Sequence, residues 1–431
     1  MVAVMGKMNL QEARHLLMRT GLGARWHDIQ RYQNLSKKRG VHHAVYSSSN
    51  RWMLPPPKLA TWISWSVKQT PKQRQHLRRR LNRDKQVLKQ WFVKNMLRTP
   101  YPLTERMMLF WHNHFTSSIN KVNQPNLLLK QNILFRRHGL ANFRQLLYAV
   151  SRDPAMLIYL DNDSNIKGKP NENFARELLE LFTLGEGHYT EADIRAAAKA
   201  FTGWTVDRRS QSFVFRKDLH DNSIKTFMGK RGRLNGKHII DRILQNPHTS
   251  EHIARQFWAE FISDEKPNSQ TIRRWGNIFR RSHYDIRTLL VAVLNSSEFW
   301  SSRYRGEKIK SPVELVVGTL RSLIIKPPST KRIVNICDTL GQKLLSPETP
   351  KGYAGGQEWI DTFTLPTRIN LMAEFINKAN RRDISRIPKL AIKDTEHWLL
   401  PRKPIRKSLS HALNQQQNLH ALLTDPAYQL T

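Results

Sequence analysis

The sequence predicts a mainly α-helical fold: one large multi-helix domain with a small β-hairpin insertion near residues 204–229. Apolar residues recur every three to four positions along most of the chain, which is the helical period. Helix start and stop signals recur between these segments. The stretch 204–229 instead alternates β-branched or aromatic residues with polar ones, which is typical of a hairpin. With 12 Trp and 17 Phe, the chain can bury a substantial core although only 39% of it is hydrophobic.

The expected helix boundaries follow from local signals. Asp153 and Ser311 are N-cap residues that each precede a proline, which is favoured at the first helical position. Gly185, Gly187 and Gly203 follow helical patterns, as left-handed C-terminal caps do. These signals and the apolar period predict helices near 9–20, 57–68, 70–98, 103–116, 124–138, 142–150, 153–160, 171–184, 190–202, 236–246, 249–262, 268–281, 285–294, 312–325, 330–339, 366–380 and 406–424.

We divide the chain into a helical N-terminal cap region, residues 1–100, and a helical core, residues 101–431, within one continuous domain. The core contains the hairpin and an irregular Gly- and Pro-containing segment at 346–366. Loops of this length in compact domains are either functional or disordered. Trp359 and Phe363 within this segment predict that it docks onto the body of the protein.

The chain is strongly basic, with 71 Lys and Arg against 34 Asp and Glu, a net charge of +37. Such a charge predicts long-range attraction to an anionic polymer, either nucleic acid or polysaccharide. The alternative is a set of solvated helix faces. The basic residues cluster at 72–83, 136–137, 225–233, 273–274, 280–281 and 402–407.

Several classes of protein are excluded. The single cysteine, Cys337, excludes an intramolecular disulfide framework and a Cys-rich metal site, and its apolar neighbours indicate a packed thiol. No phosphate loop, dinucleotide-binding glycine pattern or serine-hydrolase motif is present. No segment is apolar enough for a transmembrane helix, and no signal peptide is visible, which predicts a cytoplasmic location by default.

Four blocks of the sequence resemble a bacterial family, domain of unknown function 1800. They are ERMMLFWHNHFTS at 105–117, the long block at 153–205 that contains NENFARELLELFTLG, HDNSIKTFMGKRGRLNG at 220–236, and the stretch from 296 to 320 together with KGYAGGQEWI at 351–360. The resemblance implies a predominantly helical fold, frequent export, and a phosphatase-like partner protein encoded nearby. It implies no established activity. The strong basicity and the absence of a visible signal peptide depart from the exported pattern.

Two of these blocks contain candidate ligands for a divalent metal: His112 and His114 in the first, and His220 with Asp221 in the third. Imidazole and carboxylate groups are common metal ligands. Residues two apart on a helix point about 200° apart, so both histidines reach one metal only if the helix ends before them. The alternatives are a hydrogen-bonded histidine in an aromatic cluster at His114 and a structural turn at His220-Asp221.

A helix face in the second block contains the candidate catalytic residues Asn173, Arg176, Glu177 and Glu180, spaced by three and four positions. The two carboxylates suit acid–base catalysis or metal binding, and Arg176 suits an anionic substrate. The alternative is a solvated face with intrahelical ion pairs.

Upstream, residues 161–172 place oxygen-bearing side chains as an EF-hand loop does, but Ile166 occupies the position that normally requires glycine. We therefore expect a polar turn there.

These residues predict a hydrolase or group-transfer enzyme that acts on an anionic or polymeric substrate. In one form of this hypothesis a bound divalent metal assists the reaction. The alternative function is a non-catalytic basic binding or scaffold protein for nucleic acid, polysaccharide or a protein partner. The two differ in salt dependence, because phosphate-dominated binding weakens steeply as salt rises.

Overall fold

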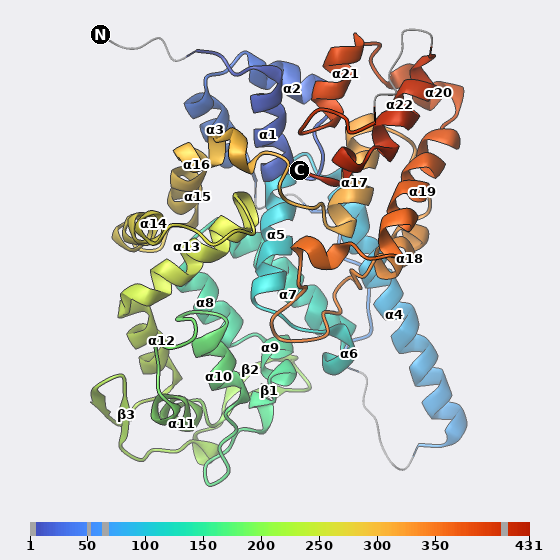
Figure 1. Cartoon of the computed structure of the whole chain (residues 1–431). Coiled ribbons are helices and arrows are strands. Elements are labelled where there is room, and N and C mark those ends of the chain that lie inside the picture. Colours follow the sequence, from blue (N-terminus) through green and yellow to red (C-terminus); the bar gives the residue numbers. More distant parts are fainter. Residues whose placement is uncertain (1–5, 50–52, 63–68, 407–412) are drawn as a thin grey trace.

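A computed structural model describes residues 6–49, 53–62, 69–406 and 413–431. Within these ranges the chain forms twenty-two α-helices and two two-stranded sheets, which confirms the mainly α-helical class (Figure 1). The helices are α1 (Leu10–Thr20), α2 (Trp26–Gln33), α3 (Lys37–Tyr46), α4 (Pro71–Arg98), α5 (Pro102–His114), α6 (Ile119–Val122), α7 (Pro125–His138), α8 (Phe143–Ser151), α9 (Pro154–Tyr159), α10 (Asn173–Glu180), α11 (Glu191–Ala200), α12 (Gly236–Gln245), α13 (Pro247–Phe261), α14 (Ser269–Arg281), α15 (Ile286–Leu294), α16 (Ser297–Trp300), α17 (Pro312–Leu323), α18 (Thr330–Thr339), α19 (Thr364–Asn377), α20 (Arg381–Arg386), α21 (Ile392–Leu399) and α22 (Gln415–Thr424).

The capping signals act as the sequence predicts. The Asp153 side chain accepts a hydrogen bond from the Met156 N–H and begins α9. Ser311 begins α17 through a reciprocal capping box with Glu314. Gly203 has φ +78°, and a Cβ there would lie 2.4 Å from the Arg216 carbonyl oxygen, so only glycine fits.

One apolar cluster extends from Met8 to Tyr428 and surrounds α5, which lies at the centre of the molecule (Figure 1). Helix α5 packs against α1, α4 and α7, and most of its side chains are buried. Trp111 is fully buried there, and its indole N–H donates to the Gly139 carbonyl at 2.8 Å. The candidate histidines of α5 therefore lie in the middle of the fold.

The hairpin near 204–229 is confirmed as β1 (Trp204–Asp207) paired antiparallel with β2 (Ser212–Phe215). A second hairpin, β3 (Lys225–Phe227) with β4 (Lys230–Gly232), follows it. The sequence pattern merges the two because each strand has only three or four residues, too few to show separate alternation.

Two predicted helices are wrong in part. Residues 57–62 of the helix expected at 57–68 are not helical, and the remainder lies outside the described residues. This segment follows Pro55, and the Ala60 N–H donates to Asp84 of α4 instead of to a helical carbonyl. The helix expected at 406–424 begins only at Gln415, and residues 407–412 lie outside the described part of the chain.

Six described helices have no counterpart in the sequence prediction: α2, α3, α6, α16, α20 and α21. All are short, between four and ten residues. Isolated helices of this length are marginal, and five of these six are supported by packing: α2 and α21 on α1, α3 and α16 on α15, and α6 on α7 and α9.

The predicted N-terminal cap region is interleaved with the C-terminal helices. Helix α1 packs against α21, and α4 packs against α17 and α18. Arg14 of α1 donates to the carbonyls of Trp398 and Leu399. These contacts bring the two ends of the sequence together beside the central helix α5.

Candidate functional site

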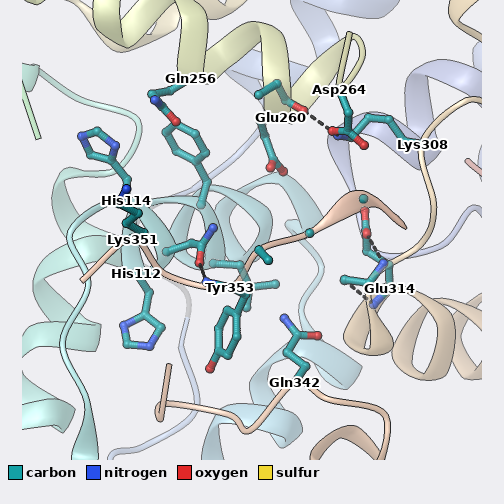
Figure 2. A pocket seen from close by; sticks show the side chains of 18 of the residues that line it. His112, His114, Gln256, Glu260, Asp264, Lys308, Glu314, Gln342, Lys351 and Tyr353 are labelled. Atoms are coloured by element: carbon teal, nitrogen blue, oxygen red, sulfur yellow. Dashed lines mark hydrogen bonds and ion pairs between the residues drawn. The ribbon is translucent and has the colours of Figure 1, made fainter. Parts of the chain in front are cut away.

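Two neighbouring cavities lie beneath the irregular segment 343–360. The first, of about 420 Å³, is bounded by α5, α13, the start of α17 and this segment (Figure 2). The second, of about 640 Å³, is bounded by α6, α9, α10 and the same segment. Pro350 lines both cavities, so the segment lies between them. Four predicted site residues line these cavities: His112 and His114 the first, and Asn173 and Glu177 the second.

The segment 343–360 is an ordered loop, fixed to the body by specific contacts. The Tyr353 N–H donates to Asn113 Oδ1 at 2.7 Å, and the Tyr353 hydroxyl donates to the Lys343 carbonyl at 2.6 Å. Gly352 has φ +84°, and a Cβ there would lie 2.3 Å from Asn113 Oδ1. Trp359 is buried, as expected, whereas Phe363 beyond the loop is 61% exposed.

The structure splits the predicted face of α10 into two pairs. Asn173 and Glu177, four residues apart, line the second cavity. Arg176 instead forms ion pairs with Glu172 and Glu191, at 3.2 and 2.8 Å, and lines neither cavity.

Glu180 also turns away from the cavities and accepts a hydrogen bond from the Tyr189 hydroxyl at 2.9 Å. The structure therefore does not bring Arg176 and Glu180 to the cavity that Asn173 and Glu177 line, because α11 and the turn before it supply other partners for both.

Glu177 differs from its neighbours because its carboxylate is half-buried. Burial, and then the charge of Glu180 one helical turn away, raise the pKa of Glu177, against the opposing charges of Lys351 and Arg176. Within the described part of the chain, its carboxylate forms no hydrogen bond or ion pair with another side chain. The other charged groups lining this cavity are paired: Lys121 with Asp161 at 2.8 Å, and Lys343 with Glu348 at 2.9 Å.

Three imidazoles line the first cavity and are neutral at pH 7: those of His112 and His114 are buried and that of His252 is partly buried. Burial lowers the pKa of His112 and His252 to about 4 and that of His114 to about 3. His114 Nε2 hydrogen-bonds to the Phe182 carbonyl at 3.0 Å, and His252 Nε2 to the Leu181 carbonyl at 2.8 Å. Since a carbonyl only accepts, both rings carry their proton on Nε2.

His112 and His114 do not converge. Helix α5 continues through His114, and Figure 2 shows the two rings pointing away from each other. His114 packs among Phe110, Trp111 and Phe115, which is the aromatic environment of the alternative interpretation. His112 Nε2 is buried without a hydrogen-bond partner in the described part of the chain.

A charged network closes the far end of the first cavity. The buried Arg106 guanidinium contacts Glu260 at 2.8 Å and Glu314 at 2.6 Å. Burial alone would raise the pKa of Glu314, but Arg106 lowers it to about 2. Lys308 pairs with Asp264 at 2.5 Å. Each charged group of this network therefore has an opposite partner, with two cations against three carboxylates.

His220 and Asp221 belong to a separate turn and line neither cavity. His220 Nδ1 donates to the Thr202 carbonyl at 2.9 Å. Asp221 accepts from the Ser223 N–H at 2.8 Å and pairs with Lys225 at 3.4 Å. These contacts describe the structural turn of the alternative interpretation.

Over the described ranges, no three His, Cys, Asp or Glu side chains converge in a way that could hold a metal ion. The predicted set of His112, His114, His220 and Asp221 is thus not gathered around one point. The turn at 161–172 is the expected polar turn: Asp161 accepts from Lys121 and from the Asn173 amide.

Sequence reasoning missed the part of the site that α13 and the residues just after it provide. His252, Gln256, Glu260 and Asp264 all line the first cavity. Figure 2 shows Gln256, Glu260 and Asp264 on the side opposite Tyr353. His252, Gln256 and Glu260 recur every four residues, which keeps them on one face of α13, and Asp264 follows just after the helix ends. This polar period was a readable signal in the sequence.

The fold and the cavities define a mainly helical protein with a polar internal site beneath a glycine-containing loop. The family model described as "Protein of unknown function (DUF1800)" matches residues 15–430 of the 431. The chain belongs to this family, as the four sequence blocks indicated. No curated protein and no solved structure matches the sequence. Across the part of the chain that the structure describes, no helix has both the length and the apolar character needed to cross a membrane.

Proposed function

We propose that the protein is a hydrolase or group-transfer enzyme in which Glu177 transfers protons at the second cavity. The observation that supports this most directly is the state of Glu177: half-buried, with a raised pKa, and without the ion partner that the other charged lining residues have. A perturbed ionisable group in a cavity is typical of a catalytic site. Structural carboxylates, in contrast, are normally paired or hydrogen-bonded.

In this proposal Glu177 takes a proton from water, or from an acceptor hydroxyl, as that oxygen bonds to the electrophilic centre of the substrate. The protonated Glu177 then gives this proton to the leaving-group oxygen as the scissile bond breaks. Asn173 offers an amide for orienting the substrate, and Lys351 of the loop, which lines the first cavity, supplies the larger of the two positive charges that act on Glu177. Glu177 returns to its starting protonation state at the end of the cycle.

The polymeric half of the predicted substrate class has more support than the anionic half. Two cavities on either side of Pro350 suit an extended substrate that passes along the loop. The charges at both cavities are largely balanced, and Arg176, the predicted anion-binding residue, is occupied by Glu172 and Glu191. A basic outer surface is compatible with such a site, so the binding-protein alternative does not compete with it directly.

The test compares Glu177→Gln with Glu186→Gln, an exposed glutamate on the loop after α10. 4-Nitrophenyl esters, phosphates and glycosides serve as probes for the reaction class. We expect Glu177→Gln to lower kcat by about 10²-fold or more, as loss of a general acid does, while Glu186→Gln keeps wild-type turnover. Full activity in Glu177→Gln would refute the assignment. Absence of turnover of all probes by the wild type would count against hydrolysis.

A further inference from the structure

Helix α4 has an N-terminal part that leaves the body of the protein. We call residues 71–83 the α4 arm. On α4 the contiguous apolar core starts at Leu88, and Leu81 is the one buried side chain of the arm, so most of the arm extends from the body (Figure 1). At 1.5 Å per residue its 13 residues span about 20 Å. The arm therefore presents much of its circumference to solvent.

The α4 arm is exceptionally basic. It contains no Asp or Glu, and the first acidic residue of the helix is Asp84. All six of its Lys and Arg side chains are exposed: Lys72, Arg74, Arg78, Arg79, Arg80 and Arg83. Arg74 also donates to the Gln69 carbonyl at 3.0 Å.

This charge is unfavourable for the helix in isolation. The N-terminus of a helix has a partial positive charge, which favours anions and disfavours cations there. Arg74 with Arg78, and Arg79 with Arg83, are like-charged pairs at i and i+4, which destabilise a helix. An anionic partner would offset both unfavourable effects. An ordinary solvated helix face has no need to concentrate positive charge in this way.

The distribution of charge around the helix distinguishes between anionic partners. At about 100° per residue, the basic side chains form two rows on nearly opposite sides. The larger row contains Lys72, His76, Arg79, Arg80 and Arg83, and the smaller row contains Arg74 and Arg78.

A flat lipid surface would contact only one of these rows. The apolar side chains of the arm after Pro71 are limited to Leu77 and Leu81, too few for the wide apolar face of a membrane-surface helix.

We propose that the α4 arm binds duplex DNA by inserting into the major groove, without sequence specificity. The groove is about 12 Å wide and admits an α-helix, and phosphates line both of its walls. Each of the two opposed basic rows faces one of the two phosphate-lined walls. A guanidinium group can donate two parallel hydrogen bonds to the oxygens of one phosphate. This inference is independent of the proposed reaction at Glu177.

The test uses the full-length chain and a fluorescein-labelled 20-base-pair duplex, with anisotropy measured over a range of salt. The arm variant is Arg79→Gln/Arg80→Gln/Arg83→Gln. Its control removes the same charge from an exposed site elsewhere, around the β4 strand. That control variant is Lys230→Gln/Arg231→Gln/Arg233→Gln.

If the arm binds DNA, its variant loses about three phosphate contacts, and the slope of log K against log salt becomes shallower by about 2.7. When salt rises from 50 to 200 mM, the affinity of the arm variant for the duplex should therefore fall by a factor about 40-fold smaller than the factor for the wild type. The control keeps the wild-type slope, and circular dichroism shows equal helicity in all three proteins.

Equal weakening by both variants would overturn the proposal, because bulk charge would then suffice. So would wild-type binding to anionic lipid vesicles or heparin without binding to the duplex.

Discussion

Replacing Gly352 by alanine should loosen the loop that separates the two cavities. Gly352 has φ +84°, where an L-residue is strained by about 1–2 kcal/mol. The new Cβ would also lie 2.3 Å from Asn113 Oδ1 and 2.6 Å from the Asn113 carbonyl oxygen. The loop must shift to relieve these contacts, and the hydrogen bond from the Tyr353 N–H to Asn113 is the first to be lost.

That hydrogen bond contributes about 1 kcal/mol, so the total cost to the closed loop is about 2–3 kcal/mol. Since 1.4 kcal/mol is a factor of ten, the loop opens about 30- to 150-fold more often. Hydrogen–deuterium exchange of peptides that cover 346–360 measures this opening directly.

Gly187→Ala provides the control for backbone strain without a clash. Gly187 has φ +80°, and a Cβ added there would meet no atom within 4 Å. In Gly187→Ala, hydrogen–deuterium exchange of the peptide that covers 183–190 should therefore increase only as much as about 1–2 kcal/mol of backbone strain produces. We expect the effect of Gly352→Ala to exceed that of Gly187→Ala by at least about fivefold. Equal effects would refute the role assigned to the contact with Asn113.

Three further predictions concern the interior. Arg136→Met leaves the fully buried Glu105 without its bidentate partner and should destabilise the protein by about 3–5 kcal/mol. The double variant Glu105→Gln/Arg136→Met should recover part of this loss, and thermal melts that rank the double variant below the single one would contradict the prediction. The pKa of His114 falls to about 3 on folding, so between pH 6.5 and 3 the ring is neutral in the folded protein and protonated in the unfolded chain, and stability falls as the pH decreases through this range. His114→Gln should reduce that pH slope by about 1.4 kcal/mol per unit in urea titrations, and an unchanged slope would argue against it. Burial, and then Asp338, raise the pKa of Cys337, so Ellman's reagent should label the thiol only after unfolding, and rapid labelling of the native protein would show that the thiol is accessible.

The helical class and many helix ends could be predicted because their causes are local. Asp153 caps α9 through the N–H of Met156, three residues away, and Ser311 caps α17 together with Glu314 at the same spacing. The apolar period needs only neighbours three and four positions away. Short helices such as α2 and α21 could not be predicted in this way, because their stability comes from packing on α1.

The candidate site was predictable only in part. Asn173 and Glu177 were identified from their spacing, and the structure places both at a cavity. The same spacing could not show that Arg176 is held by Glu191, which belongs to another helix. The spacing argument that His112 and His114 point apart on a continuous helix agrees with the structure, because α5 continues through both.

The sequence alone determined the helical fold class, the family and the basic character of the chain, because periodicity, caps and charge are properties of neighbouring residues. Tertiary structure decided which side chains share a cavity. Asn113 meets Tyr353 across 240 positions, and Arg106 meets Glu314 across 208. Such contacts depend on how whole helices pack. Packing likewise determined that Glu177 lines a cavity and has no ion partner, whereas Glu180, one turn away, lies outside both cavities and bonds to Tyr189.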